Sequence, residues 1–146
     1  MSAISPQVQA DLMRRAVQAA RDAYAPYSRF RVGAAVLGAA GIYIGTNVEN
    51  ASYGLTLCAE RSALAAAVAA GDRRIGAVAL ACIDARAETG IQGLLPCGAC
   101  RQWLAELAPQ STLFIYRQEQ TFTPAQLLPL AFDIQPDPPP SSDKSS

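Results

Sequence analysis

The hydrophobic and polar positions of the first third of the chain follow a helical spacing and then a strand-like one. Apolar residues recur at helical spacing after Ser5 and Pro6, a capping hydroxyl followed by a proline suited to the first helical position. This helix is expected to end before Pro26, because proline cannot continue a helix. Strands are then predicted over 30–37 and 42–48, joined by a turn with a glycine at each end.

The rest of the chain alternates helices with apolar strands. Helices are predicted over 60–70, 97–107 and a short 125–130, and strands over 74–83, 112–116 and an antiparallel edge at 121–123. A strand–helix–strand order gives parallel pairing with helices on the faces of the sheet. The sequence therefore predicts an α/β fold with a mixed sheet, in which helix N-termini lie along the edge where the parallel strands end.

Length and composition indicate one globular domain. The chain has 146 residues, of which 51% are hydrophobic and only 16% charged, as in a packed domain. We assign the ordered domain to residues 1–134. Residues 135–146 contain mainly proline, serine and aspartate, and a disordered tail is predicted there.

The charge balance bears on possible partners and location. The 12 basic and 12 acidic residues cancel, and the only lysine is Lys144. A neutral chain without a basic run argues against nucleic acid as a partner. Apolar stretches such as 75–83 are too short to span a membrane, and residues 1–15 lack a signal pattern. We therefore expect a cytoplasmic protein with no membrane contact.

The chain contains no histidine. A Ser–His or Cys–His catalytic pair, a histidine base and a histidine metal ligand are all excluded. Acid–base chemistry near neutral pH must come from a carboxylate, a thiol, a tyrosine or a metal-bound water.

The four cysteines suggest metal or redox chemistry. Cys97 and Cys100 form a C-x-x-C pair, which fits half of a zinc site, a redox disulfide or coincidence. Cys82 lies within an apolar strand and is interpreted as a buried thiol, although it remains a possible fourth ligand. Cys58 is then the candidate third ligand.

Cys58 and the C-x-x-C pair both fall at predicted helix starts. A helix N-terminus favours the thiolate form of cysteine. If the two helices flank neighbouring strands, the three thiolates converge on one point. Three protein ligands with an open fourth position are typical of a catalytic zinc, whereas a structural zinc normally takes four.

Two charged residues follow Cys58 closely. Glu60 can face the open coordination position without binding the metal, and it can transfer protons there. The alternative is that Glu60 is a first-turn glutamate that only complements the helix dipole. Three thiolates on zinc leave one net negative charge. Arg61, three residues after Cys58, is predicted to offset that charge by donating to the sulfurs; the alternative is an ordinary surface arginine.

Several blocks of sequence together resemble one enzyme family. They are residues 25–35, 47–53, 58–61 with the Cys-Ala-Glu motif, 96–102 with the Pro-Cys-Gly-Ala-Cys motif, and 127–132. In this order they resemble the homotetrameric zinc-dependent cytidine deaminases, in their three-cysteine form. The resemblance extends from about residue 8 to residue 132. It implies a three-layer α/β/α sandwich with a five-stranded mixed sheet.

The resemblance also implies a role for each matching residue. Cys58, Cys97 and Cys100 would bind one zinc ion per chain, and Glu60 would shuttle protons. The substrate would be a free pyrimidine nucleoside, cytidine or 2′-deoxycytidine. Asn47 and Glu49 would bind its ribose. Phe30 would pack against the base, and the Ala59 backbone N–H would donate to the base carbonyl. Tyr53 and Phe132 would lie at subunit contacts of a homotetramer, near a neighbour's site.

One position departs from the family pattern. Many members carry proline where this chain has Arg31, and the side chain is expected to point outward. Asn47 and Glu49 could also be no more than the solvated face of a strand end, and Phe30 and Phe132 ordinary core residues.

Three other functions remain open at the level of the sequence. The substrate could be another aminopyrimidine compound or a base within RNA, although the pair Asn47 and Glu49 favours a free ribose. The chain could also be a non-catalytic module stabilised by zinc. Finally, Cys97 and Cys100 could form a redox disulfide.

Overall fold

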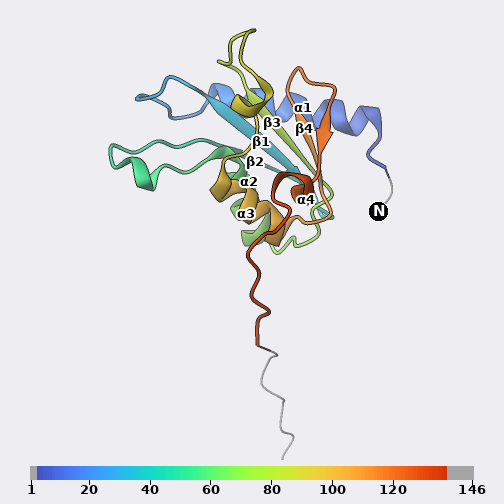
Figure 1. Cartoon of the computed structure of the whole chain (residues 1–146). Helices are drawn as coiled ribbons and strands as arrows, with labels where there is room; N and C mark the ends of the chain where they lie inside the picture. The colour runs from blue at the N-terminus through green and yellow to red at the C-terminus, as the bar shows by residue number, and fades with distance from the viewer. Residues whose placement is uncertain (1–2, 138–146) are drawn as a thin grey trace, which may run out of the picture.

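The computed structural model describes residues 3–137, which form six helical segments and five strands (Figure 1). The helices are α1 (Pro6–Arg21), α2 (Ala59–Ala69), α3 (Gly98–Leu107) and α4 (Pro124–Leu127), with short 3₁₀ turns η1 (Tyr53–Leu55) and η2 (Ile91–Gly93). The strands are β1 (Val32–Leu37), β2 (Ile42–Thr46), β3 (Ala77–Cys82), β4 (Thr112–Ile115) and β5 (Thr121–Phe122).

The five strands form one mixed sheet in the order β2-β1-β3-β4-β5. Strands β3 and β4 are parallel, with Ala79 opposite Phe114, and α3 lies on the connection between them. The remaining neighbours are antiparallel, including the β1–β2 hairpin. The mixed sheet with a parallel central pair was predicted from the order of the elements and is confirmed.

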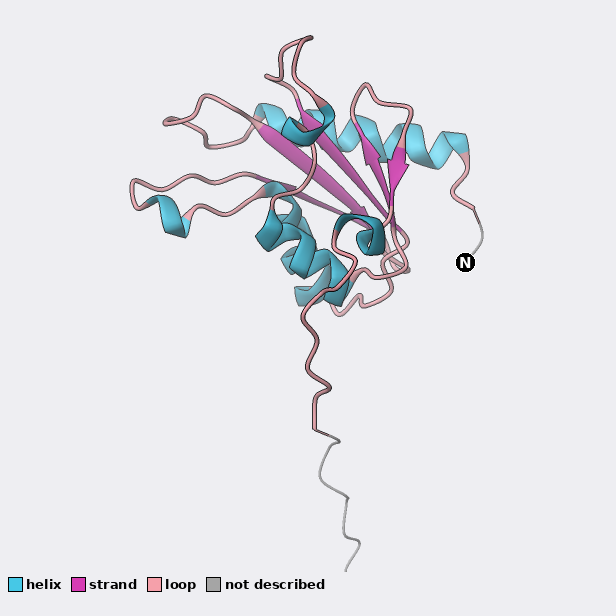
Figure 2. Cartoon of the chain, in the orientation of Figure 1, coloured by secondary structure: helices cyan, strands magenta, loops and turns pink. Residues whose placement is uncertain are grey.

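Helices cover both faces of this sheet, as Figure 2 shows. Helix α1 packs on one face, where Leu12 and Ala16 meet Ala35 and Ala79. Helices α2, α3 and α4 cover the other face, over a core that includes Leu64, Leu80, Leu104, Leu113 and Leu127. The three-layer sandwich implied by the resemblance is confirmed. Its two apolar cores hold the sheet and the helix N-termini in fixed relative positions.

Two glycines let helices approach the sheet unusually closely. A Cβ atom at Gly33 would overlap the Ala16 carbonyl oxygen of α1. At Gly45 on β2, a Cβ would overlap the Ala63 amide and lie 2.6 Å from the Ala59 carbonyl oxygen of α2. Gly45 therefore brings the first turn of α2 directly against the sheet.

The predicted strands are longer than the observed ones at their outer ends. The strand predicted from residue 30 begins at Val32, because Arg29 adopts a left-handed conformation with φ of 58° and the Phe30 N–H donates to the Ser28 hydroxyl. The strand predicted over 42–48 ends at Thr46. Val48 instead pairs with Tyr24 and Leu57 in isolated bridges.

The last helix is also displaced from its prediction. Instead of 125–130 it spans Pro124–Leu127, because Thr123 forms a capping box with Gln126 that fixes the start of the helix. Beyond it, the chain has no regular structure as far as residue 137. Most of the tail predicted at 135–146 lies outside the described residues. None of the described helices is long and apolar enough to cross a membrane.

Candidate metal centre and active site

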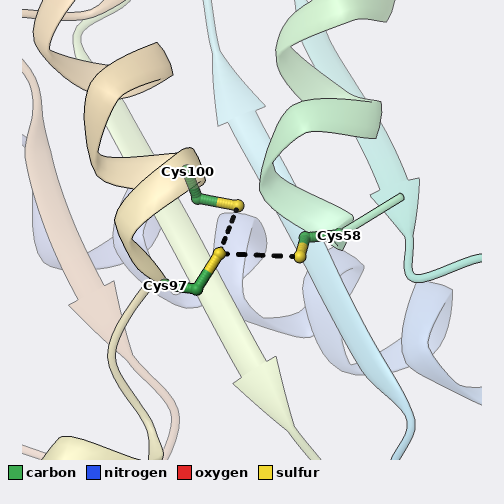
Figure 3. Close-up of side chains that lie close together, drawn as sticks. All are labelled: Cys58, Cys97 and Cys100. Carbon is green, nitrogen blue, oxygen red and sulfur yellow. Dashed lines mark hydrogen bonds between the residues drawn. The ribbon is translucent and has the colours of Figure 1, made fainter. Parts of the chain in front are cut away.

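Three cysteines from two helix N-termini face one another on the side of the sheet covered by α2 and α3 (Figure 3). Cys58 is the N-cap of α2 and Cys97 is the N-cap of α3, while Cys100 lies in the first turn of α3. Both helix N-termini therefore direct their partial positive charge at the same cluster of thiols. The convergence of the three cysteines, which the sequence predicted only if the helices flank neighbouring strands, is confirmed.

The distances between the sulfur atoms fit a zinc ion. The Cys97 sulfur lies 3.8 Å from that of Cys58 and 3.6 Å from that of Cys100, and the three sulfurs are all within 4.8 Å of one another. Tetrahedral ligands at a Zn–S distance of about 2.3 Å are roughly 3.8 Å apart. Cys82 is not part of this cluster. Three thiolates thus leave one of four zinc positions for another ligand.

Cys82 behaves as the buried thiol that the sequence predicted. It is partly buried at the end of β3, and this burial raises the pKa of its thiol to about 12. A partly buried thiol outside the cluster packs as a small hydrophobic side chain.

Arg61 faces the cluster from the first turn of α2. Its Nη2 donates to the Cys58 sulfur at 3.4 Å and to the Thr56 carbonyl oxygen at 3.4 Å. Interaction with the Cys100 thiol and with Arg61 lowers the pKa of Cys58, and the hydrogen bond to Cys58 raises the pKa of Arg61. The Nε of Arg61 is buried without a partner among the described residues. This arginine is therefore no ordinary surface side chain.

Glu60 is a buried carboxyl beside the sulfurs. Only 5% of the residue is exposed, and this burial raises the pKa of Glu60 to about 7, with the charge of Cys58 adding to the effect. Burial raises the pKa of Cys82, and hydrogen bonding with Cys58 together with burial raises that of Cys100; the charge of Glu60 adds to both. A carboxyl with a pKa near neutrality is suited to both accept and donate a proton.

Asn47 and Glu49 are both engaged with the segment that precedes β1. The buried Asn47 accepts from the Val32 N–H and donates to the Phe30 carbonyl oxygen, both at 2.8 Å. One Glu49 oxygen accepts from the Tyr27 and Ser28 N–H groups at 2.9 and 3.1 Å. Hydrogen bonding by the Ser28 side chain, and then by these two backbone N–H groups, lowers the pKa of Glu49.

Glu49 and Tyr53 line one cavity of about 440 Å³, together with Tyr27, Ser28 and Thr56. The Tyr27 and Tyr53 rings meet edge to face, with centroids 6.0 Å apart. Phe132 lies elsewhere in the chain: it lines a separate cavity beside α3, and its carbonyl oxygen accepts from Gln102 Nε2 at 2.8 Å.

The remaining two predicted substrate residues occupy different surroundings. Phe30 is half-buried just before β1, and its carbonyl oxygen is held by Asn47. Ala59 is fully buried as the first residue of α2, a position whose backbone N–H has no acceptor within the helix.

One charged contact was missed by sequence analysis. Arg31 was expected to point outward, but its guanidinium pairs with Asp84, which follows β3, through Nη2 and Oδ1 at 2.8 Å. The only signal in the sequence was an aspartate directly after an apolar strand, with nothing to indicate its partner 53 residues away.

Comparison with known proteins agrees with the geometry of the site. Residues 6–116 match the family described as the cytidine and deoxycytidylate deaminase zinc-binding region. A cytidine deaminase from Halalkalibacterium halodurans is 47% identical over 85% of this chain and 93% of its own length, and one from Mycobacterium tuberculosis is 45% identical over 88% and 93%.

Solved structures extend this agreement to the fold. The crystal structure of a cytidine deaminase from Burkholderia pseudomallei superimposes with a TM-score of 0.75 and 39% identity, covering 88% of this chain and all of that one. A cytidine deaminase structure from Mycobacterium tuberculosis gives a TM-score of 0.71 at 40% identity, covering 86% of this chain and 98% of that one. The chain therefore belongs to the cytidine and deoxycytidylate deaminase family.

Proposed function

We propose that this protein is a cytidine deaminase, which hydrolyses cytidine and 2′-deoxycytidine to uridine and 2′-deoxyuridine with release of ammonia, as in pyrimidine salvage. The observation that carries this proposal is the cluster of Cys58, Cys97 and Cys100 with the buried carboxyl of Glu60 beside it. The relatives that share most of this chain's length are cytidine deaminases.

Cys58, Cys97 and Cys100 would hold one zinc ion per chain. When bound, zinc lowers the pKa of a coordinated water towards about 7 and so supplies a nucleophile at neutral pH. Arg61 tunes this site. Its hydrogen bond to the Cys58 sulfur places a positive charge against the excess negative charge of three thiolates.

Glu60 is the proton carrier of the reaction. Its carboxylate takes a proton from the attacking nucleophile and delivers it to the ring nitrogen beside the amine-bearing carbon, which makes that carbon more electrophilic. After addition to the carbon, Glu60 takes the second proton from the added hydroxyl group and gives it to the amine, so that ammonia leaves as the carbonyl forms. Its pKa near 7 suits both directions of transfer.

Four further residues bind the nucleoside in this proposal. Asn47 and Glu49 contact the ribose hydroxyls. Glu49 lines its cavity while one of its carboxylate oxygens accepts from backbone N–H groups. Asn47 donates one amide proton to Phe30 and has a second one for the substrate. Phe30 packs against the pyrimidine, and the Ala59 N–H at the start of α2 donates to the base carbonyl oxygen.

We infer that the active enzyme is a cytoplasmic homotetramer, with Tyr53 and Phe132 near a neighbour's site. Both side chains are largely exposed in the single chain, with 73% and 72% of their surface accessible. All four cysteines are free thiols, as expected in a reducing compartment.

The test is to incubate purified protein with cytidine and to follow both the ultraviolet change to uridine and the release of ammonia. Elemental analysis of the same sample should give one zinc per chain. The Cys97→Ala variant is the matched control and should lose both zinc and activity, whereas Cys82→Ala should keep both. Wild-type protein that carries zinc but releases no ammonia from cytidine would refute the proposal.

A further inference from the structure

The segment before β1 is anchored at every backbone amide. Each N–H from residue 27 to residue 32 donates a hydrogen bond, and the acceptors in order are the Glu49 carboxylate twice, the Ala25 carbonyl, the Ser28 hydroxyl, the Asp84 carboxylate and the Asn47 side chain. Such complete pairing in an irregular, largely exposed segment fixes one backbone path. Phe30 lies in the middle of this path and is half-buried.

This backbone path includes a conformation that the chain does not prefer. Arg29 has φ of 58°, in the left-handed region that non-glycine residues rarely adopt. A residue held there persists only when its surroundings over-determine it. The hydrogen bonds on both sides of Arg29 are therefore what keeps the turn in place.

The side chains from outside the segment that accept these hydrogen bonds follow two different strands. Asn47 and Glu49 follow β2, and both are already assigned to the ribose. Asp84 follows β3, and it is the anchor that ties the segment to the centre of the sheet. Its Oδ2 accepts from the backbone N–H and from Nε of Arg31, both at 2.9 Å, and its Oδ1 accepts from Nη2 at 2.8 Å.

Asp84 is attached to the central strand of the sheet. It lies two residues after Cys82, the last residue of β3. The Arg31–Asp84 pair therefore connects the turn that carries Phe30 to the end of β3. A paired guanidinium and carboxylate with two parallel hydrogen bonds provides a defined geometry as well as attraction.

We propose that Asp84, acting through Arg31, is a positioning residue that holds Phe30 in place for the pyrimidine base. This inference rests on the proposed function, in which Phe30 packs against the base. Asp84 touches neither the substrate nor the reacting atoms. Its effect is to keep the turn at residues 27–31 in the binding-competent path before the nucleoside arrives.

A positioning role predicts a particular kinetic signature. If the turn without Asp84 is competent in only about one molecule in ten, the apparent affinity for substrate falls about tenfold. The zinc ligands and Glu60 lie on helices α2 and α3, so turnover of bound substrate should change by less than about twofold. The Asp84→Ala variant should therefore have a raised KM for cytidine at nearly unchanged kcat and zinc content.

The test is a double-mutant cycle between Asp84 and Phe30, with KM and kcat for cytidine measured in four proteins. Asp84→Ala should raise KM about tenfold in the wild-type background. In the Phe30→Ala background it should raise KM by less than about twofold, because the side chain that it positions is gone. Arg31→Ala should have a smaller effect than Asp84→Ala, because the Arg31 backbone N–H can still donate to Asp84.

Two further proteins make the result decisive. Asp11→Ala is the matched control and should leave KM unchanged. Asp11 bonds to Arg14 and Arg15 on α1, which packs on the face of the sheet opposite α2 and α3. Asp84→Asn keeps the size of the side chain and replaces Asp84→Ala if that variant does not fold. Equal effects of Asp84→Ala in both backgrounds, or a fall in kcat instead of a rise in KM, would overturn the inference. A wild-type protein without activity would instead refute the proposed function.

Discussion

At the scale of single residues, the chemistry of this protein depends on what burial does to a few ionisable groups. Glu60 is buried and Cys82 is partly buried, and in both burial raises the pKa. For the carboxyl the result is a group that can exchange protons near neutral pH. For the thiol the result is a side chain that keeps its proton near neutral pH.

Replacing Glu60 by glutamine should remove most turnover and leave the metal in place. The amide is nearly the same size but cannot accept a proton, and general acid–base catalysis is commonly worth about 10²–10⁴-fold. Steady-state rates with cytidine and elemental analysis for zinc measure the two effects separately. Glu106→Gln, an exposed position on α3, is the control and should be fully active. Near-normal activity in zinc-loaded Glu60→Gln protein would contradict the assignment.

Replacing Arg61 by glutamine should lower turnover while zinc stays bound. The three sulfurs would lose the positive charge now 3.4 Å from Cys58, and the site would become a weaker Lewis acid. We expect a drop of about tenfold, equivalent to about 1.4 kcal/mol, and an upward shift of the acidic limb of the pH–rate profile. An unchanged profile at full zinc occupancy would show that the helix N-termini alone balance the thiolate charge.

At the scale of elements, the site depends on where helices begin. Cys58 and Cys97 cap α2 and α3, so the packing of these helices on the sheet sets the distances between the sulfurs. For α2 this packing runs through Gly45, where the strand and the helix backbone are in contact. A change at the sheet should therefore be felt at the metal centre.

Gly45→Ala should destabilise the protein and disturb the zinc site. The added methyl overlaps backbone atoms of Ala59 and Ala63, which cannot move without displacing α2, and overpacking of this kind costs about 1–3 kcal/mol. Urea unfolding measures the loss, and zinc retention against a chelator reports on the site. Gly41→Ala has nothing within 4 Å of the new methyl and should be nearly neutral. Equal stabilities of the two variants would contradict this account of the α2 packing.

The Arg31–Asp84 pair should make stability depend on pH in the acid range. Hydrogen bonds from Arg31 lower the pKa of Asp84 to about 2, below its ordinary value of 3.8. A carboxyl with a depressed folded-state pKa stabilises the fold above its unfolded pKa, and this stability is lost as the pH falls from about 4 to about 2.

Because both partners are partly exposed, we expect this contribution to be about 1 kcal/mol. Thermal unfolding of wild type and Asp84→Asn at pH 6 and pH 1.5 measures it. The two proteins should differ in stability at pH 6 and converge at pH 1.5, below the folded-state pKa of Asp84. A difference that stays constant with pH would show that the pair does not contribute through its charge.

Local signals predicted the elements well and the long-range contacts poorly. The Ser5–Pro6 cap, the apolar periodicity and the C-x-x-C spacing are properties of neighbouring residues, and they located the helices and the zinc ligands. The pairing of Arg31 with Asp84 spans 53 residues, and its geometry exists only in the folded sheet. No local pattern could have indicated it.

Strand ends were predicted too far outward for a related reason. Residues 30 and 31 directly precede the apolar run of β1, so the sequence pattern alone assigned them to the strand. The left-handed Arg29 and the side-chain acceptors of Ser28 and Asp84 instead turn them into an anchored loop. Side-chain acceptors compete with the sheet for backbone N–H groups, and that competition is decided by tertiary structure.

At the scale of the whole molecule, the exposed large apolar side chains of residues 3–137 include two groups that lie close together in the sequence. One is on η1, with Tyr53 and Leu55, and the other follows α4, with Leu130, Phe132 and Ile134. Water-exposed side chains of this size in neighbouring positions are typical of surfaces that other protein chains cover. The cavity lined by Glu49 and Tyr53 lies at the first of these regions.

Assembly into a homotetramer should therefore cover these regions, and sedimentation should give four times the mass of the chain. Phe132→Ala should weaken binding of cytidine, because its ring would reach a neighbour's site, whereas it is remote from the Glu49 cavity of its own chain. Deleting residues 136–146 is the matched control: it removes a polar segment beyond the apolar positions and should leave both assembly and activity intact. Leu55→Ser, at 70% exposure in the single chain, tests the other region and should shift the protein towards smaller species. A monomer with full activity would contradict the tetramer and, with it, the placement of Phe132 at a neighbour's site.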